Sequence, residues 1–218
     1  MAVDAVLVGT KTSGTGNLTT GAGTTTSGST FVVFVSYDAG ATLLTVTDSK
    51  LNVYTLIDDE SSNGHIKAIY RSENGTGGAS HTATVTFTGS SNGTAYLVEA
   101  TGAAAASFDQ TAVAIDSTEP FTVTLPTLSQ ADEVILSICG NATGGAQVYV
   151  SSNTTIIGSE LDGNTYWTSA ISKTVVASTA AFTPSWTSDA DLSPHTIMAA
   201  TFKQAAAGGD VLQAQICM

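Results

Sequence analysis

Short runs of strand-forming residues recur along the whole chain, with turn-forming residues between them at spacings of roughly 8 to 15 residues. The chain has 218 residues, and 36 of them are threonine. Threonine is β-branched, so it loses side-chain freedom in a helix, whereas it fits the pleated surface of a sheet well. The pattern predicts an all-β protein with little or no helix, an antiparallel β-sandwich or a barrel.

Two of these runs predict how the strands are buried. In the run 81–88, Ala83, Val85 and Phe87 alternate with threonines, which predicts a strand with one buried face and one solvated face. In the run 31–35 every residue is apolar, which predicts a central strand that is covered on both faces. The segment 100–108 is the one place where a short helix is expected, with a loop as the alternative.

The composition changes toward both ends of the chain. Residues 1–29 are expected to form an N-terminal arm or edge strands, residues 30–203 the sandwich, and residues 204–218 a C-terminal linker and tail. The tail is apolar enough to dock on a neighbouring molecule, although a frayed end is the other interpretation. Its candidate interface residues are Val211, Leu212, Ile216 and Met218.

The charge balance limits the partners that the chain can bind. Six basic residues stand against 18 acidic ones, a formal net charge of −12. Nucleic acids and anionic membranes need lysine and arginine, so neither is expected as a partner. No apolar run is long enough to span a bilayer, and no signal peptide is recognisable, so the chain is expected to be made in the cytoplasm.

A G-x-S-x-G match, residues 89–93, raises the question of a hydrolase. In a nucleophile elbow the serine lies between a strand and a helix. Here a strand-like run precedes Gly89, but the segment after Asn92 and Gly93 is rich in strand-forming residues. Asn-Gly is also a strong hairpin signal, so the match is interpreted as a turn between two strands. No catalytic residue and no enzymatic activity are predicted.

The sequence contains no clear metal-binding motif. His65, His81 and His195 do not form a local ligand motif, and no C-x-x-C motif occurs. The acidic cluster 58–60, Asp58-Asp59-Glu60, is expected in a loop at the end of a strand, where calcium binding is possible but solvated carboxylates are the commoner outcome. Asp189 and Asp191 form a weaker candidate of the same kind. No cofactor is predicted.

The two cysteines and two tryptophans are interpreted mainly as core residues. Cys139 lies in an apolar run and is expected in the interior, and Cys217 stands beside the C-terminal residue. A disulfide between the two cysteines is left open. Trp167 and Trp186 lie in strand-like runs and are expected in the core rather than on a sugar-binding surface.

Several runs resemble a β-sandwich module of phage and bacterial surface proteins. The resemblance rests first on a strand that ends in Thr-Asp-Ser, followed by Asn and an aromatic residue, and on an aromatic strand before a Gly-rich turn. It rests further on the motif His-Thr-x-Thr-Val-Thr-Phe and on a strand with a glutamate before a glycine. The Ala-Asp-Glu entry to a central strand, residues 131–133, and the closing strand complete it. It covers about residues 30 to 203, and Lys50 and Leu51 depart from it, since small residues are usual there. The residues of this sequence that carry it best are Asp48, Ser49, Asn52, Tyr54, Tyr70, His81, Phe87 and Glu99.

The resemblance implies a jelly-roll-like display scaffold in phage tail fibres or capsid decorations, without catalytic residues. The expected function is therefore that of a non-enzymatic virion structural protein, most simply a capsid decoration or head-surface protein. Its expected partners are copies of itself, with a trimer as the guess, and virion proteins such as the major capsid protein. The alternative is a receptor- or carbohydrate-binding module of a tail fibre, which would bind glycan.

Overall fold

The computed structural model describes residues 2–12, 16–88, 92–141, 147–161, 168–189 and 194–206. These residues form antiparallel strands and no helix, which confirms the predicted all-β class. Accordingly, the described part of the chain contains no helix that could cross a bilayer.

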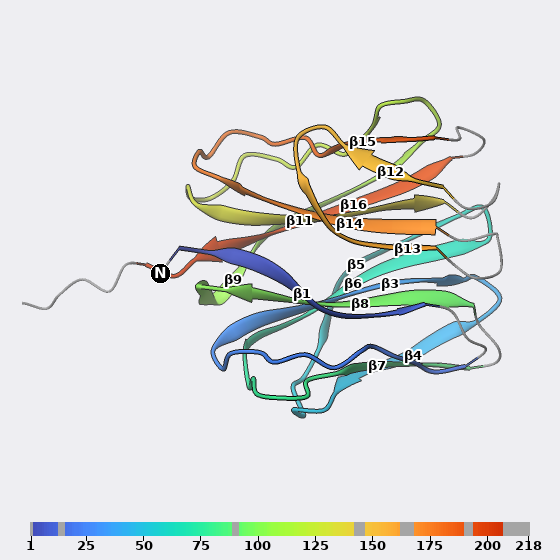
Figure 1. Cartoon of the computed structure of the whole chain (residues 1–218). Coiled ribbons are helices and arrows are strands. Elements are labelled where there is room, and N and C mark those ends of the chain that lie inside the picture. Colours follow the sequence, from blue (N-terminus) through green and yellow to red (C-terminus); the bar gives the residue numbers. More distant parts are fainter. Residues whose placement is uncertain are drawn as a thin grey trace, which may run out of the picture.

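The first half of the chain forms a sandwich of two sheets (Figure 1). Its larger sheet contains, in spatial order, β1 (Asp4–Thr12), β8 (Gly93–Thr101), β3 (Ser29–Asp38), β6 (His65–Gly75) and β5 (Thr55–Ser62). Its smaller sheet contains β2 (Leu18–Thr19), β7 (Ala83–Thr88) and β4 (Thr42–Asp48). The order 1-8-3-6 facing 2-7-4 is that of a jelly roll, with β5 added to the larger sheet.

The second half of the chain repeats this arrangement strand by strand. Its larger sheet contains β9 (Ala103–Asp116), β16 (His195–Gln204), β11 (Glu133–Asn141), β14 (Thr168–Val176) and β13 (Thr155–Leu161). Its smaller sheet contains β10 (Phe121–Thr122), β15 (Ser185–Ser188) and β12 (Tyr149–Ser151). Each strand takes the place of the strand eight numbers earlier, so the chain consists of two structural repeats of one jelly roll.

The two sandwiches are stacked so that their five-stranded sheets face each other and the three-stranded sheets lie outside (Figure 1). The central core between the two larger sheets contains Val32 and Phe34 of β3 together with Leu136 of β11 and Phe202 of β16. Two further cores fill the individual sandwiches. The molecule is therefore a stack of four sheets with three apolar layers between them.

The burial of β3 explains its continuous apolar sequence. Phe31, Val33 and Val35 face the smaller sheet of their own sandwich, whereas Val32 and Phe34 face the second sandwich. Both faces are covered, so no position along the strand can be polar without a partner. The predicted central strand is confirmed, and so is the alternation in β7, whose apolar residues are buried while its threonines point outward.

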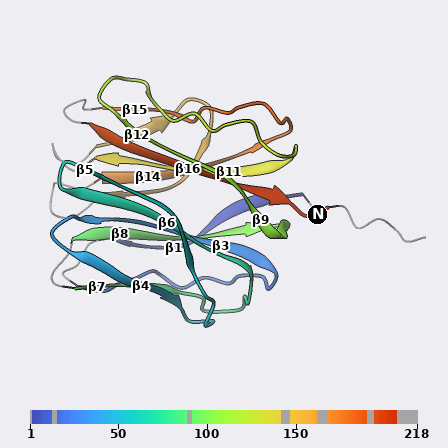
Figure 2. The same ribbon diagram turned by 180° about the vertical axis from the view of Figure 1, so that it is seen from behind.

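β9 ties the two sandwiches together (Figure 2). It pairs with β16 of the second sandwich, while Ser107 within it donates or accepts a 2.8 Å hydrogen bond with Thr30 of β3. The backbone N–H of Phe108 donates to the Glu73 carboxylate of β6 at 2.7 Å. The helix or loop expected over 100–108 is therefore wrong, because Gly102, at φ 68°, turns the chain directly from β8 into β9.

The predicted domain limits need correction. Residues 1–29 contribute β1 and β2, which are edge strands of the two sheets of the first sandwich, one of the two alternatives expected for this segment. They therefore belong to the same unit as the residues after them. The single sandwich expected over 30–203 is two sandwiches, since alternation reveals strands but not the sheet that each strand joins. Gln204, predicted to begin the linker, is the last residue of β16, and residues 205–206 follow it, where the Ala205 N–H donates to the Gly102 carbonyl at 2.9 Å.

Shortening a side chain in the central core should destabilise both sandwiches at once. We expect Phe34→Ala to cost about 3 to 5 kcal/mol of unfolding free energy. Calorimetry should show a single transition that moves to lower temperature without splitting. The control is Leu44→Ala in β4, where Leu44 is 56% exposed, and this change should alter the free energy of unfolding by about 0.5 kcal/mol or less. Two separated transitions in Phe34→Ala would contradict the shared core.

Candidate functional site

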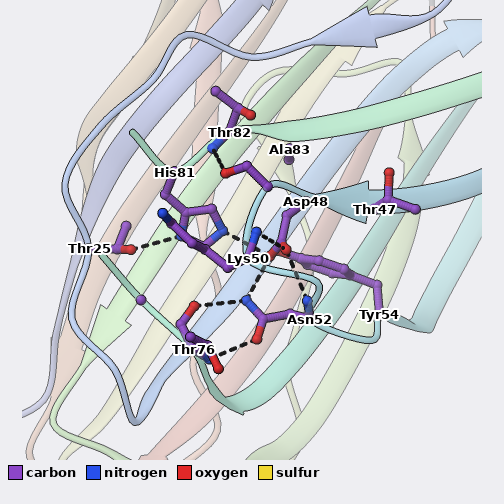
Figure 3. A network of polar contacts seen from close by, with 12 residues as sticks. Thr25, Thr47, Asp48, Lys50, Asn52, Tyr54, Thr76, His81, Thr82 and Ala83 are labelled. Carbon is purple, nitrogen blue, oxygen red and sulfur yellow. Dashed lines mark hydrogen bonds and ion pairs between the residues drawn. The ribbon is translucent and has the colours of Figure 1, made fainter. Parts of the chain in front are cut away.

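A buried polar network lies at the end of β4, where Asp48 stands at its centre (Figure 3). The Asp48 carboxylate accepts hydrogen bonds at Oδ1 from the backbone N–H groups of Lys50 and Asn52, at 2.9 and 3.0 Å. At Oδ2 it accepts from the Asn52 side-chain amide at 2.7 Å and from the Tyr54 hydroxyl at 3.0 Å. One carboxylate thereby fixes the start, middle and end of the loop 49–54.

His81 forms a further hydrogen bond with the Asp48 carboxylate. Its Nε2 lies 2.8 Å from Asp48 Oδ2, and both side chains are completely shielded from solvent. Its Nδ1 lies 2.8 Å from the Thr25 hydroxyl, and its ring packs edge-on against Phe31 at 4.6 Å between centroids. The two ring nitrogens thus contact Asp48 and Thr25, so every polar atom of the imidazole has a partner.

Asn52 connects this network to a second loop, residues 76–82. Its side-chain amide donates to the Thr76 carbonyl at 3.0 Å, and its oxygen accepts from the Thr76 N–H at 2.7 Å. Lys50 Nζ donates to the Ala79 carbonyl at 2.6 Å, and the Ser49 hydroxyl donates to the Ser80 carbonyl at 3.1 Å. The two loops are therefore held to each other by side chains and not by strand pairing.

The network shifts the ionisation of its members. Burial raises the pKa of the Asp48 carboxyl, but the hydrogen bonds from Asn52, His81 and Tyr54 together outweigh burial and hold this pKa below its ordinary value. Burial and the neighbouring Asp48 carboxylate raise the pKa of the Tyr54 hydroxyl far above its ordinary value. Asp48 is thus a stable buried anion, and Tyr54 remains a hydrogen-bond donor.

The loop held by this network presents two aliphatic side chains to solvent. Leu51 is 91% exposed and Val53 is 82% exposed. Leu51 also has a φ of 62°, in the left-handed region that disfavours a leucine. The Asp48 hydrogen bonds to the residues on both sides of Leu51 impose that conformation, so the loop is fixed although its two apolar side chains bury almost nothing.

The described residues of the second sandwich place a smaller polar cluster, without a carboxylate at its centre, at the end of the equivalent strand β12. An isolated bridge joins Gly23 to His81 in the first sandwich, and its counterpart joins Leu125 to Phe182. β12 ends at Ser151 and is separated from β13 by residues 152–154 only, whereas the longer loop 49–54 follows Asp48. Asn153 of this shorter loop donates to the Thr183 carbonyl at 2.7 Å and accepts from the Ser185 N–H at 3.1 Å, much as Asn52 bonds to Thr76. The carboxylate at the centre of the first network therefore accompanies the longer loop of the first sandwich.

A polar pocket of about 310 Å³ adjoins the network. Leu51, Asn52 and Val53 line one side, and residues 71–76 line the other. Arg71 Nε donates to Glu73 Oε2 at 3.2 Å, and its guanidinium lies 4.1 Å from the centre of the Phe108 ring. The pocket is therefore polar but close to electrically neutral.

The order Thr25, His81, Asp48 matches the hydroxyl, imidazole and carboxylate of a catalytic triad, but the geometry does not suit catalysis. Thr25 and His81 are buried, and the Thr25 hydroxyl already accepts a hydrogen bond from the Gly78 N–H at 3.2 Å. None of the three side chains lines the adjoining pocket. A nucleophile must reach a substrate, so the arrangement is suited to holding loops in place.

The residues of the G-x-S-x-G match lie in part outside the described residues, since the structure describes Asn92 and Gly93 but not residues 89–91. A strand rather than a helix follows, as expected. The predicted hairpin is nevertheless wrong. β7 pairs with β2 and β4, and β8 pairs with β1 and β3, so the connection crosses from one sheet of the sandwich to the other.

The predicted metal candidates are separate in the structure. His65 contacts Ser36, His195 contacts Gln147, and His81 contacts Asp48, so the three histidines do not converge. The acidic cluster 58–60 lies within edge strand β5 and not in a loop, so its carboxylates alternate between the two faces of the sheet. Among the residues that the structure describes, no group of three or more potential ligands could hold a metal ion.

Other sequence-based predictions have mixed outcomes. Cys139 and Trp186 are buried in the core of the second sandwich, as expected. Cys217, Trp167, Asp191 and the tail residues Val211, Leu212, Ile216 and Met218 lie outside the described residues. Glu99, highlighted by the resemblance, is buried and accepts hydrogen bonds from the Thr26 N–H and the Ser29 hydroxyl, each at 2.7 Å.

The sequence analysis predicted no polar network, although it singled out four of the residues that form it. Asp48, Asn52, Tyr54 and His81 all carry the resemblance to the phage module, and the structure brings these four together. Thr25 was missed because it lies in the Gly- and Thr-rich region 1–29, where nothing distinguishes it from neighbouring threonines. The ion pair between Arg71 and Glu73 could have been predicted from the sequence, because alternate residues of a strand lie on the same face of the sheet.

Comparisons with known proteins identified no relative of the chain. The chain matches no protein-family model, and searches of curated proteins and of solved structures found no match. The fold and the site therefore define the class by themselves: an all-β protein of two fused jelly-roll sandwiches, the first of which carries a rigid loop braced by a buried network.

Replacing the central carboxylate should be costly. Asp48→Asn leaves the hydrogen-bond donors of His81 and the loop without the buried anion, and we expect a loss of about 3 kcal/mol in urea-induced unfolding. Asp59→Asn, an exposed position of edge strand β5, is the matched control and should change stability by about 0.5 kcal/mol or less. Equal stabilities of the two variants would contradict the bracing role of Asp48.

The same carboxylate should contribute to stability in a pH-dependent way. Because the folded-state pKa of Asp48 lies below its ordinary value of 3.8, its contribution is present above about pH 3.8 and is lost as pH falls through the lowered value. Urea midpoints of the wild type and Asp48→Asn, measured from about pH 6 to about pH 2, should converge at the acid end. A constant difference across that range would show that ionised Asp48 is not the stabilising form.

Proposed function

We propose that the chain is a non-enzymatic structural protein of a phage virion, a capsid decoration or head-surface protein that packs against the shell or against copies of itself. The observation that carries the proposal is the fusion of two jelly rolls through one shared core, which makes a rigid block with little internal freedom. Jelly rolls are frequent in viral capsid proteins, and this analogy of fold adds support.

The surface of the molecule supports a role in packing. Charged residues make up 11% of the chain, and β4 and β7 present threonines such as Thr45 and Thr86, whose hydroxyls lie 2.6 Å apart. Hydroxyl-covered sheets have few charges that must lose water when two molecules meet. The hydroxyl, imidazole and carboxylate chain at Asp48 is buried, which favours a structural rather than an enzymatic role.

A pocket next to Arg71 favours one alternative, a receptor- or carbohydrate-binding module of a tail fibre. Its polar lining suits a hydroxyl-rich ligand. However, the exposed large hydrophobic residues among those described are all aliphatic, so the aromatic platforms typical of sugar binding are lacking there. Titration calorimetry with neutral and acidic oligosaccharides tests this alternative, and binding that is lost in Asn74→Ala would favour it over the structural role.

The structural role predicts stoichiometric copies of the chain on purified virions, counted by quantitative mass spectrometry against the major capsid protein. Because each molecule carries a formal charge of −12, added salt should screen repulsion between copies. Association should therefore persist or strengthen between about 0.1 and 1 M salt. Absence of the chain from particles, or association that disappears with salt, would contradict this role.

A further inference from the structure

A second pocket, of about 300 Å³, lies where β8 turns into β9 at the junction of the two sandwiches. Residues 26–29, in the loop that leads into β3, line one side of it, and residues 101–103 line the other. The lining consists of glycine, alanine, serine and threonine, without a charged side chain. A cavity of about 150 Å³ holds a benzene molecule, so this pocket has room for two aliphatic side chains.

The end of β16 brings the chain to the rim of this pocket. Gln204, the last residue of β16, lies opposite Ala103 in the antiparallel pairing with β9. The Ala205 N–H then donates to the Gly102 carbonyl at 2.9 Å. Gln204 is also fixed from the other side, because its side-chain oxygen accepts from the Val3 N–H at 3.1 Å, and the start of β1 lies beside the end of β16 (Figure 1). The chain therefore leaves β16 in contact with two residues that line the pocket.

The sequence beyond Ala206 combines a turn signal with an apolar segment. Residues 208–210 read Gly-Gly-Asp, which is typical of a turn. Val211 and Leu212 follow the turn directly, within the apolar tail for which docking is expected. Residues 207–218 lie outside the described part of the chain. A chain that reverses at residues 208–210 returns Val211 and Leu212 toward the pocket that it has just passed.

The length of the connection favours the chain's own segment as the occupant of the pocket. Val211 follows Ala206 by five residues, and an extended chain covers about 3.3 to 3.6 Å per residue, so the reach is roughly 17 Å. Ala205 already touches the lining, so the pocket lies within this reach. A short flexible connection holds a segment at an effective concentration in the millimolar range, which a separate molecule reaches only in a concentrated solution.

Charge does not oppose this contact. Asp4 lies beside the pocket-lining end of β8, but Lys173 donates to its carboxylate at 2.6 Å. Glu99 is buried behind the lining and accepts two hydrogen bonds from the loop 26–29, each at 2.7 Å. Asp210 is the single charged side chain of residues 207–218, and it lies in the turn signal rather than in the apolar segment.

We propose that residues 207–218 fold back on their own molecule and that Val211 and Leu212 fill the pocket between residues 26–29 and 101–103. The segment then covers the junction of the two sandwiches beside the start of β1. Any molecule that binds this pocket must first displace the segment, so the segment competes with partners for it. The contact lies within one chain, so it goes beyond the proposed function and does not depend on it.

Cross-linking tests whether the segment reaches the pocket. In a Cys217→Ser background, Leu212→Cys is combined with Thr26→Cys, and mild oxidation should give a disulfide within the monomer whose yield is independent of protein concentration. The matched control combines Leu212→Cys with Leu44→Cys in the outer strand β4, and this pair should stay reduced. Equal oxidation of the two pairs would overturn the inference. Covalent dimers in place of the monomeric product would overturn it as well, because they would show exchange between copies.

Hydrogen exchange tests whether the apolar side chains make the contact. In the double variant Val211→Asn, Leu212→Asn the amides of residues 26–29 and 101–103 should exchange about tenfold faster than in the wild type, since the pocket is uncovered. Amides of β3 should keep their rates, which shows that the sandwiches remain folded. The control, Gln213→Asn with Gln215→Asn, changes polar positions of the same segment and should exchange as the wild type does. Unchanged exchange around the pocket in the double variant would contradict the inference.

Discussion

The central core between the two five-stranded sheets is the interaction on which the rest of the structure depends. Each larger sheet has an apolar side chain on both faces of its middle strands, so a sandwich on its own would expose one of those faces. Stacking the sheets removes both faces from water at once. The N-terminal strand β1 and the connecting strand β9 then lie at the margins of this layer, where they join the halves.

Comparing the two jelly-roll repeats shows which features they share and which occur only in the first. Both repeats share strand order and the isolated bridge before β7 and β15. At that bridge the first repeat has His81 opposite Gly23, where the second has Phe182 opposite Leu125. The first repeat also has the longer loop, residues 49–54 after β4, whereas residues 152–154 follow β12. A buried carboxylate is costly unless its lone pairs are satisfied, and here five hydrogen bonds satisfy them. The network keeps an exposed loop in one conformation.

Much of the fold can be predicted from the sequence, because strand periodicity is a local property. The alternation in 83–88 and the continuous apolar run 31–35 identified an outer strand and a central strand correctly. The duplication could not be predicted, since the repeats share topology and little sequence: β3 reads STFVVFVSYD, whereas the equivalent strand β11 reads EVILSICGN. Partner strands are chosen by long-range packing, which periodicity does not encode. The resemblance singled out Asp48, Asn52, Tyr54 and His81 individually, but it predicted neither the contacts among them nor the part played by Thr25.

Native-state hydrogen exchange tests the shared core most directly. If the two sandwiches form one cooperative unit, the slowest amides of β3 and β11 should exchange through the same global unfolding reaction, with equal opening free energies and equal dependence on denaturant. Opening of β11 at a distinctly lower free energy than β3, or the reverse, would show that the sandwiches unfold independently and would contradict a common core.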